Sequence, residues 1–163
     1  MTPFQAVPAP LARVMICDDS AVIRAAITRA LEADPAIRVV ARAANGRDAV
    51  ETLRRTVVDV IVLDIEMPVL DGIAALPLLL AADPGVRIVM ASTLTTRGAD
   101  IALRAVRLGA ADYIPKPSAI DGLGDAAFRD ELVAKVKGLA RLRRAAAAAT
   151  PQRPAGAPPP TPR

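Results

Sequence analysis

The sequence predicts an α/β fold, a single doubly wound sheet of five parallel strands flanked by five helices. Short, β-branched apolar runs alternate five times with segments whose apolar residues recur every three to four positions. The apolar runs are nearly unbroken, as expected for parallel strands that helices cover on both faces. Regular alternation of the two patterns indicates right-handed crossovers between neighbouring parallel strands.

Five runs rich in Val, Ile, Leu and Ala are predicted to form the strands of this sheet. Each is followed by a segment with helical periodicity. The predicted strands are Arg13–Cys17, Arg38–Ala41, Val57–Leu63, Arg87–Ala91 and Ala111–Ile114.

The first three predicted helices begin at residues suited to cap a helix N-terminus. Ser20 precedes the first apolar stripe, Asn45 the second and Asp71 the third. Asp71 is therefore interpreted as a cap and not as a ligand. Pro77 falls within the third helix, where it either kinks the helix or belongs to its first turns.

The last two helices are predicted from apolar spacing and from one glycine. The fourth spans roughly Arg97–Leu108, and Gly109 fits its C-terminal cap. The fifth is expected to continue through Ala145–Ala149, and its apolar stripe consists of Phe128, Leu132, Val136 and Leu139.

A chain of 163 residues predicts one domain, which residues 12–142 are expected to form. Residues 1–11 are expected to be a disordered N-terminal tail. Six of the last thirteen residues are Pro, so residues 143–163 are interpreted as an Ala/Pro-rich interdomain linker or tail.

The composition excludes several kinds of site. The chain has no histidine, so a Ser-His-Asp, Cys-His or His-ligated metal site cannot be built from it alone. The single cysteine, Cys17, lies in an apolar run and is interpreted as a buried small hydrophobe. One cysteine offers no disulfide framework and fits a reducing compartment.

No run approaches the ~20 apolar residues of a membrane span, and the N-terminus lacks the pattern of a signal peptide. A cytoplasmic protein without membrane insertion is expected. With no Trp, one Tyr and two Phe, an aromatic platform for nucleic acid is not expected.

Residues 129–163 hold 8 of the 21 basic residues and 2 of the 17 acidic ones. The excess of basic residues in this segment is interpreted as a solvated helix face and a linker. Contact with nucleic acid or anionic lipid is the alternative.

Three acidic residues and a lysine are predicted to meet at one edge of the sheet. Asp64 ends the third strand, Asp18-Asp19 follow the first and Lys116 follows the fifth, at the edge where open α/β sheets bind ligands. Clustered carboxylates favour a hard divalent cation such as Mg²⁺. A carboxylate can also attack phosphorus to give an acyl phosphate, whose oxygens a lysine and the Ser92 hydroxyl can bind.

These residues also have ordinary structural interpretations, and Thr93 competes with Ser92 for the hydroxyl role. Asp64 can be a strand terminator, and Asp18-Asp19 can be an acid pair that is favourable at a helix N-terminus. Lys116 can be a solvated lysine, and Ser92 a turn residue. Their coincidence at strand ends favours a functional site.

Four motifs resemble the receiver domain of two-component response regulators, over about residues 12–140. Each motif is weak alone, but all four in order at strand ends are specific. The resemblance implies a flavodoxin-like receiver fold. The motifs are Ile16-Cys17-Asp18-Asp19-Ser20, Val62-Leu63-Asp64-Ile65-Glu66-Met67-Pro68-Val69-Leu70-Asp71-Gly72, Val89-Met90-Ala91-Ser92-Thr93 and Tyr113-Ile114-Pro115-Lys116-Pro117.

By this resemblance Asp64 is the phosphoacceptor. Asp19 and Asp64 would bind Mg²⁺ through their carboxylates, Glu66 through its backbone carbonyl and Asp18 through a metal-bound water.

The resemblance also implies a switch. Ser92 would be the switch hydroxyl, Tyr113 a rotating aromatic and Lys116 the phosphate partner. A plain core or rim position is the alternative for Tyr113. The Lys116-Pro117 bond would be cis, which proline makes accessible.

Three segments resemble more narrowly the chemotaxis protein-glutamate methylesterases: Ser92–Asp100, Pro115–Ser118 and Phe128–Lys137. In that family a linker joins the receiver to a C-terminal esterase domain. No Gly-rich nucleophile loop follows here, so the esterase is expected to be absent from this chain. The chain itself would have only Mg-dependent self-phosphorylation and dephosphorylation, whereas a full-length parent would be a protein-glutamate methylesterase.

The function implied is a phospho-accepting receiver that takes its phosphoryl group from a histidine kinase and switches an effector, such as a methylesterase domain. The alternative is a stand-alone receiver that acts by docking. Chemotaxis receptor or adaptor proteins are further expected partners, and a phosphorylation-dependent dimer is compatible with this interpretation.

Two other functions are disfavoured by particular residues. An aspartyl phosphatase resembling the haloacid dehalogenases wants an Asp two residues after the nucleophile, where Glu66 stands. A dinucleotide-binding domain needs a Gly-rich turn where Asp18-Asp19-Ser20 stand.

Overall fold

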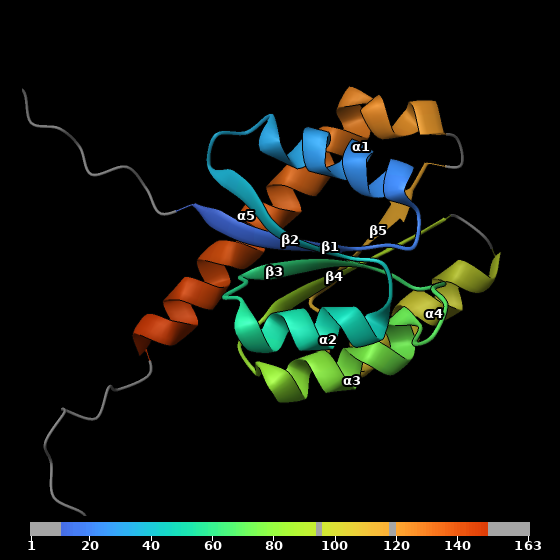
Figure 1. The fold of residues 1–163 in the computed structure, drawn as a ribbon. Coiled ribbons are helices and arrows are strands. Elements are labelled where there is room, and N and C mark those ends of the chain that lie inside the picture. Colours follow the sequence, from blue (N-terminus) through green and yellow to red (C-terminus); the bar gives the residue numbers. More distant parts are fainter. Residues whose placement is uncertain (1–10, 94–95, 118–119, 150–163) are drawn as a thin grey trace, which may run out of the picture.

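A computed structural model of the chain describes residues 11–93, 96–117 and 120–149. Five parallel strands form one sheet in the order β2-β1-β3-β4-β5 (Figure 1). The predicted doubly wound sheet is confirmed. The strands are β1 (Ala12–Cys17), β2 (Ile37–Ala43), β3 (Val60–Asp64), β4 (Arg87–Thr93) and β5 (Asp112–Lys116).

Five α-helices cover this sheet, and a short 3₁₀ helix, η1 (Ile120–Gly124), precedes the last of them. Helices α1 and α5 lie on one face, and α2, α3 and α4 lie on the other (Figure 1). The helices are α1 (Ala21–Glu32), α2 (Gly46–Arg55), α3 (Gly72–Ala82), α4 (Thr96–Arg107) and α5 (Ala126–Ala149). Within the described residues, no helix combines the length and apolar character that a membrane span requires.

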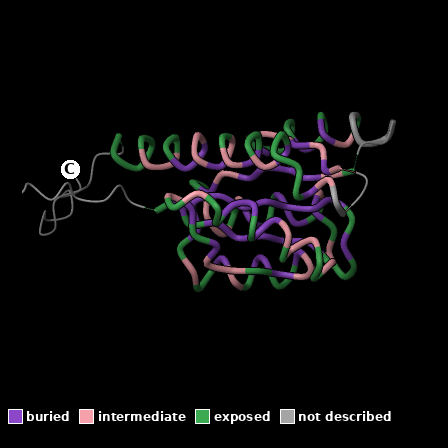
Figure 2. The backbone as a smooth tube through the Cα atoms, turned by 90° about the horizontal axis from the view of Figure 1, so that it is seen from above, coloured by how far each residue is buried: buried purple, intermediate pink, exposed green. Residues whose placement is uncertain are grey.

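Two apolar layers fix the helices to the sheet. Ile27 and Leu31 of α1 pack with Leu132 and Val136 of α5 against one face of the strands. Residues of α2, α3 and α4, including Leu76, pack against the other face. Strands therefore run through the buried centre of the molecule (Figure 2), as their unbroken apolar sequences predict.

The predicted helix starts are confirmed by their capping bonds. The side chains of Ser20, Asn45 and Asp71 accept hydrogen bonds from backbone amides three residues later. Gly109 adopts a φ of 113° two residues after the end of α4, as expected of a C-terminal cap. Pro77 is exposed, and α3 continues through it to Ala82.

All five strands differ from their predicted bounds by one to three residues at one end or both, and the differences in β3, β4 and β5 concern the site. β3 begins at Val60 and not at Val57, which is 58% exposed. β4 and β5 extend to Thr93 and Lys116, whose backbones pair across the sheet. Pairing depends on backbone groups, so polar residues can extend a strand beyond its apolar run.

Helix α5 continues past the domain end expected at residue 142. Two arginines in this extension bind residues at the end of the sheet where the strands begin. Arg143 pairs with Asp83 at 2.9 Å and with Asp59 at 3.4 Å, and Arg144 donates to the carbonyl of Leu11. The expected boundary therefore lies inside a continuous helix. Ala145–Ala149 are helical, as predicted.

Asp59 is the buried centre of this cluster, with 1% of its surface exposed. Its carboxylate also accepts two bonds from the Arg13 guanidinium and one from the Arg13 amide. Burial alone would raise the pKa of Asp59, but the bonds and charge of Arg13 lower it overall. The carboxylate therefore stays ionised.

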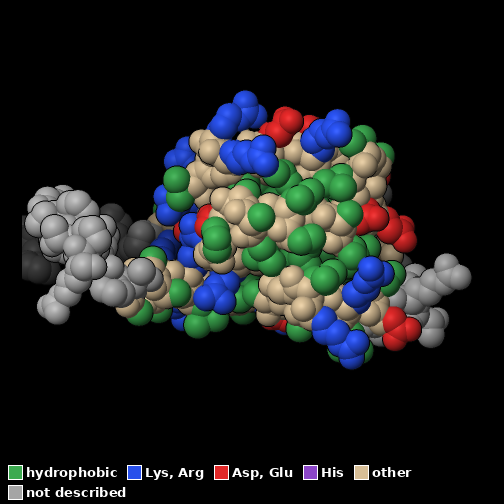
Figure 3. All heavy atoms as spheres, turned by 90° about the horizontal axis from the view of Figure 1, so that it is seen from below, with side chains coloured by type: hydrophobic (Ala, Val, Ile, Leu, Met, Phe, Trp, Pro, Cys, Tyr) green, Lys and Arg blue, Asp and Glu red, His purple; other side chains and the backbone are tan. Residues whose placement is uncertain are grey.

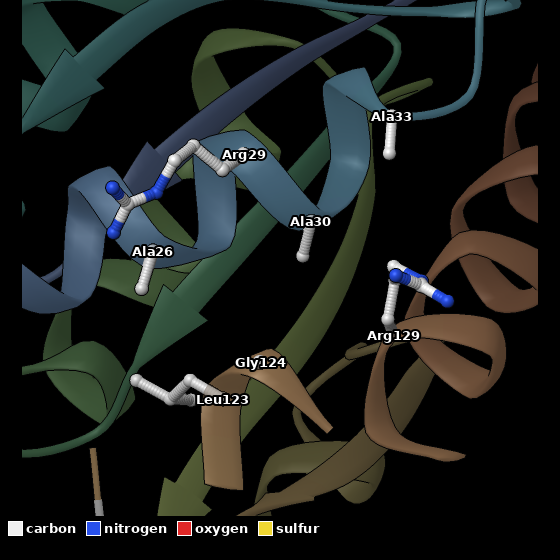
Figure 4. Close-up of a pocket in the computed structure, with 7 residues that line it drawn as sticks. All are labelled: Ala26, Arg29, Ala30, Ala33, Leu123, Gly124 and Arg129. Atoms are coloured by element: carbon white, nitrogen blue, oxygen red, sulfur yellow. The ribbon is translucent and has the colours of Figure 1, made fainter. Parts of the chain in front are cut away.

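A small cavity of about 390 Å³ lies between α1, η1 and the start of α5 (Figure 4). Ala26, Ala30 and Ala33 leave this space because their side chains are short. The guanidinium groups of Arg29 and Arg129 at its rim point away from each other. The cavity therefore lacks convergent polar groups for a ligand.

Candidate functional site

The predicted acidic residues lie together at the carboxyl edge of the sheet. Asp18 and Asp19 follow β1, and Asp64 ends β3. One carboxylate oxygen from each lies within 4.8 Å of the others. Asp18 and Asp64 are 2% and 8% exposed, whereas Asp19 is exposed to solvent. Two acids are thus held inside the fold and the third lies at the mouth of the site.

Lys116 joins this cluster from the end of β5. Its Nζ donates to Oδ2 of Asp18 at 2.9 Å and to Oδ1 of Asp64 at 3.1 Å. Only 5% of the residue is exposed. The solvated-surface interpretation of Lys116 is therefore wrong, because the structure places its ammonium group between two buried carboxylates.

Burial and neighbouring charge perturb the site. Burial raises the pKa of Asp64 to about 6, against the opposing charge of Lys116 and with a further contribution from Asp18. Burial alone would lower the pKa of Lys116, but its bond to Asp18 and the charge of Asp64 raise it overall. The ammonium group therefore stays protonated, and an acidic site with a net negative charge remains.

The perturbed carboxyl predicts a pH-dependent stability when divalent cations are absent. A raised pKa means that the folded state binds this proton more tightly than the unfolded chain. The proton on Asp64 therefore stabilises the folded state. This contribution to the free energy of unfolding is full below about pH 4 and is lost as the pH rises through about 6, a change on the order of 2–3 kcal/mol. Urea unfolding of wild type and Asp64→Asn at several pH values in chelator measures it. A difference between the two proteins that does not vary with pH would contradict the assignment.

The backbone around the cluster is fixed by local bonds. The amide of Ser20 donates to Oδ1 of Asp18, and the Arg24 guanidinium donates to the backbone carbonyl of Asp18. The amide of Ile65 donates to Oδ1 of Asp64 at 2.9 Å. Arg24 was not identified from the sequence; its only signal was a basic residue in the first helix, six positions after Asp18.

Gly72 lets the loop after Asp64 turn back against β3. Its amide donates to the carbonyl of Ile65. A Cβ at position 72 would overlap the backbone carbonyl of Asp64. Only glycine permits this approach, so Gly72 helps to place the predicted phosphoacceptor.

Glu66 and Asp19 line the same groove at the edge of the cluster. Both are exposed. Asp71 caps α3, as predicted, and accepts from the amide of Ala74 at 2.8 Å.

Ser92 and Tyr113 lie beside the cluster but do not bond to it. Ser92 is half-buried on β4, and its hydroxyl donates to the carbonyl of Thr93 at 3.4 Å. Tyr113 is half-buried on β5 and packs against the apolar layer beneath α2, α3 and α4. The structure therefore brings Asp18, Asp19, Asp64 and Lys116 together and leaves Ser92 and Tyr113 at the periphery.

The predicted cis bond between Lys116 and Pro117 is wrong for this structure, because no cis peptide bond occurs in the described residues. Cys17 is buried as predicted. Burial, with the charges of Asp18 and Asp64, raises the pKa of its thiol to about 12.

The residues of the cluster fit a hard divalent cation. The donor set consists of carboxylate oxygens alone, with no sulfur or nitrogen ligand among the three acids. Mg²⁺ prefers one or two carboxylates together with waters and phosphate oxygens. The exposed carboxylate of Asp19 gives such an ion access from solvent.

The family model for the response regulator receiver domain matches residues 14–128. A protein-glutamate methylesterase/protein-glutamine glutaminase of Rhodospirillum centenum is 68% identical over 128 residues, which cover 78% of this chain and 32% of that protein. One from Azospirillum brasilense is 59% identical over 139 residues, which cover 85% of this chain and 35% of that protein. The chain thus spans about a third of the length of these relatives.

Solved structures show the same relationship. The response regulator domain of Thermotoga maritima CheB is 38% identical, with a TM-score of 0.73, and the match covers 80% of this chain and 97% of that one. A chain of the CheX-CheY-BeF₃-Mg²⁺ complex from Borrelia burgdorferi is 26% identical, with a TM-score of 0.66. The match covers 78% of this chain and 87% of that one. Receiver domains bind Mg²⁺ at an acidic pocket, and this chain carries a cluster of that kind. The chain belongs to the response regulator receiver domain family and is homologous to the N-terminal regulatory domains of CheB chemotaxis proteins.

Proposed function

We propose that this chain accepts a phosphoryl group on Asp64 from a histidine kinase and thereby switches an effector. One observation carries the proposal: the Asp64 carboxylate lies at the tip of β3, 3.1 Å from the Lys116 ammonium and beside two further acids. Membership of the receiver family supports it, because receiver domains take phosphoryl groups from histidine kinases and regulate effectors.

Asp64 supplies the nucleophile in this proposal. One of its carboxylate oxygens attacks phosphorus of a phosphohistidine, a P–O bond forms, the P–N bond breaks and the kinase imidazole leaves with the electron pair. At neutral pH a pKa of about 6 leaves the carboxylate mostly ionised and therefore nucleophilic. Lys116 already donates to Asp64, so it can redirect a bond to a phosphoryl oxygen without leaving the site.

Bound Mg²⁺ would neutralise negative charge on the transferring phosphoryl oxygens. We propose that Asp19 and Asp64 hold it directly, that Asp18 holds it through water and that Glu66 contributes its backbone carbonyl. Asp19 is the exposed member of the cluster and so faces the solvent from which the ion enters.

Removing Asp19 is expected to weaken Mg²⁺ binding at least several-fold. The remaining charge offsets too little of the cost of partly dehydrating a small, hard cation. Titration calorimetry of Asp19→Ala against wild type measures the change. Asp48→Ala, an exposed acid on α2 outside the cluster, is the control and should bind normally. Equal binding by Asp19→Ala and wild type would remove Asp19 from the metal site.

The effector proposed is a methylesterase domain, because the curated relatives are named protein-glutamate methylesterases and glutaminases. The alternative is a stand-alone receiver that acts only by docking on another protein. Reading the gene beyond the codon for Arg163 distinguishes the two. In either case the histidine kinase, and chemotaxis receptor or adaptor proteins, are the proposed partners, in the cytoplasm.

Phosphorylation is proposed to change the surface formed by α4, β5 and α5. Ser92 lies next to Ala91, whose Cα is paired with that of Asp64, so its hydroxyl is near enough to reorient toward a new phosphoryl oxygen. Tyr113 is half-buried on the neighbouring strand, where it pairs with Met90, and it is proposed to rotate when Ser92 moves. Such a switch is a population shift, driven by contacts that differ between two states.

Beryllofluoride, a phosphoryl mimic, should therefore change amide NMR signals across residues 92–115 of the wild type. The same changes should shrink in Ser92→Ala, because the hydroxyl that bonds the mimic is absent. Thr28→Ala, which removes a hydroxyl from α1, is the control and should respond like the wild type. Changes confined to the loops around Asp18, Asp64 and Lys116 in the wild type would contradict the switch.

A further inference from the structure

Helix α3 has no polar side chain, although one of its faces is exposed. Its sequence is Gly-Ile-Ala-Ala-Leu-Pro-Leu-Leu-Leu-Ala-Ala. Leu76 and Leu79 are fully buried, as a core-facing stripe should be. On the outer side, Ala74, Pro77 and Leu78 are exposed, and Leu78 has 48% of its surface in solvent. A helix with apolar residues all round is ordinarily covered on every side.

Two grooves flank this exposed ridge. A groove of about 1050 Å³ between α3 and α4 is lined by Pro68, Ile73, Pro77, Ile101 and Leu108, among others. A smaller one of about 350 Å³ toward α2 is lined by Val50, Val69, Leu70 and Leu78. The ridge and its two grooves are called the α3 surface below. Figure 3 views this side of the molecule and shows apolar side chains gathered at its centre.

Val69, at the rim of the α3 surface, is held in an unfavourable backbone conformation. Its φ is 70°, which is an outlier for a β-branched residue, and 71% of the residue is exposed. Left-handed backbone conformations of this kind are strained, and such strain clusters at functional sites and ligand clamps. Here the strained backbone holds an exposed valine side chain, which adds apolar area at the edge of the groove.

Basic residues border the α3 surface on both long sides. Arg47 and Arg54 line the groove toward α2, and Arg104 lines the groove toward α4. Among the described residues, none of these three guanidinium groups has an ion pair or a side-chain hydrogen bond to another residue. Three acids, Asp19, Glu66 and Asp71, line the larger groove at the end nearest the site. A fourth, Glu51, lines the groove toward α2 together with Arg47 and Arg54.

We propose that the α3 surface binds a helix of a partner protein whose apolar stripe is flanked by Asp and Glu residues. α3 is 11 residues long, about 16 Å, so two or three turns of the partner can lie along it. The grooves are concave, which suits inserted side chains better than a lipid surface. Away from the site, the three unpaired arginines outnumber the single acid Glu51 and so favour carboxylates on the partner. Arginine is also enriched at protein interfaces. Glu66 and Asp71 disfavour acids at the end of the partner helix nearest the phosphoacceptor.

Two synthetic helical peptides of about four turns test this proposal. Both carry one Leu stripe, which is flanked by Glu in the first peptide and by Lys in the second. The Glu-flanked peptide should bind the 163-residue chain about tenfold more tightly in fluorescence polarisation. Its amide NMR shifts should fall on α3 and on the residues that line the two grooves.

Matched variants assign the binding to the α3 surface. Leu78→Lys should reduce binding of the Glu-flanked peptide about tenfold. Val22→Lys on α1 is the control, because Val22 is 56% exposed on the opposite face, and it should bind normally. The double variant Arg47→Glu and Arg54→Glu should reverse the preference and favour the Lys-flanked peptide.

Four outcomes would overturn the proposal. The first is equal binding of both peptides, and the second is binding of neither. The third is Leu78-dependent binding to phosphatidylglycerol vesicles in place of the peptide, which would identify a membrane surface. The fourth is a dimer of this chain, seen by ultracentrifugation, that Leu78→Lys disrupts and Val22→Lys does not.

Discussion

Asp64→Asn is expected to abolish the acid-labile phosphoryl adduct that the wild-type chain forms with a small phosphodonor and Mg²⁺. An amide at this position is neither charged nor nucleophilic enough to attack phosphorus. The other buried acid, Asp18, has its carboxylate engaged by Lys116 and by the amide of Ser20. Intact-protein mass spectrometry before and after acid treatment measures the adduct.

Asp71→Asn is the matched control for this experiment. Asp71 lies in the same loop region and serves as the N-cap of α3. Asparagine caps helices as well as aspartate does, so folding should be preserved and the adduct should form normally. A full adduct on Asp64→Asn would show that another residue accepts the phosphoryl group, and the proposed function would have to be reassigned.

Gly72→Ala is expected to lower the free energy of unfolding by about 2–3 kcal/mol and to impair phosphorylation. Alanine normally stabilises a helix relative to glycine. Here its methyl group would overlap the backbone carbonyl of Asp64, so β3 or the start of α3 has to move. Urea unfolding reports the stability, and the phosphodonor assay reports the displacement of Asp64.

Gly138→Ala provides the opposite expectation from the same chemical change. Gly138 lies within α5, and a Cβ there would meet no atom within 4 Å. The variant should gain about 0.5–1 kcal/mol through helix propensity. If both variants changed stability in the same direction, the steric reason given for Gly72 would fail.

The sheet, the helix starts and the charged cluster could be predicted because each has a local signal. Ser20, Asn45 and Asp71 cap helices in isolation from the rest of the fold. Asp64 and Lys116 end strands, and parallel strands bring their ends to one edge. Apolar periodicity and the shared edge of parallel strands were therefore sufficient to predict that Asp64 and Lys116, 52 positions apart, lie close together.

Other features depend on contacts that have no local signal. Asp59 is buried in ion pairs with Arg13 of β1 and Arg143 of α5. The sequence gives no sign that these two arginines lie close to Asp59. For the same reason the apolar run before β3 predicted a strand that starts at Val57, although that residue is exposed. The apolar character of α3 was present in the sequence, but its exposed face became evident only once α2 and α4 were placed beside it.

The cluster around Asp59 determines where the chain leaves the domain. Arg143 bridges Asp59 and Asp83, and Arg144 lies 3.8 Å from Asp59, so the last turns of α5 are joined to the residue before β3 and to the cap of α3. This anchor lies at the edge of the sheet opposite the phosphoacceptor. The end of α5 is therefore poorly suited to act as a rotating lever. The direction of α5 is set at Arg143 and Arg144, at the end of the sheet away from the phosphoacceptor.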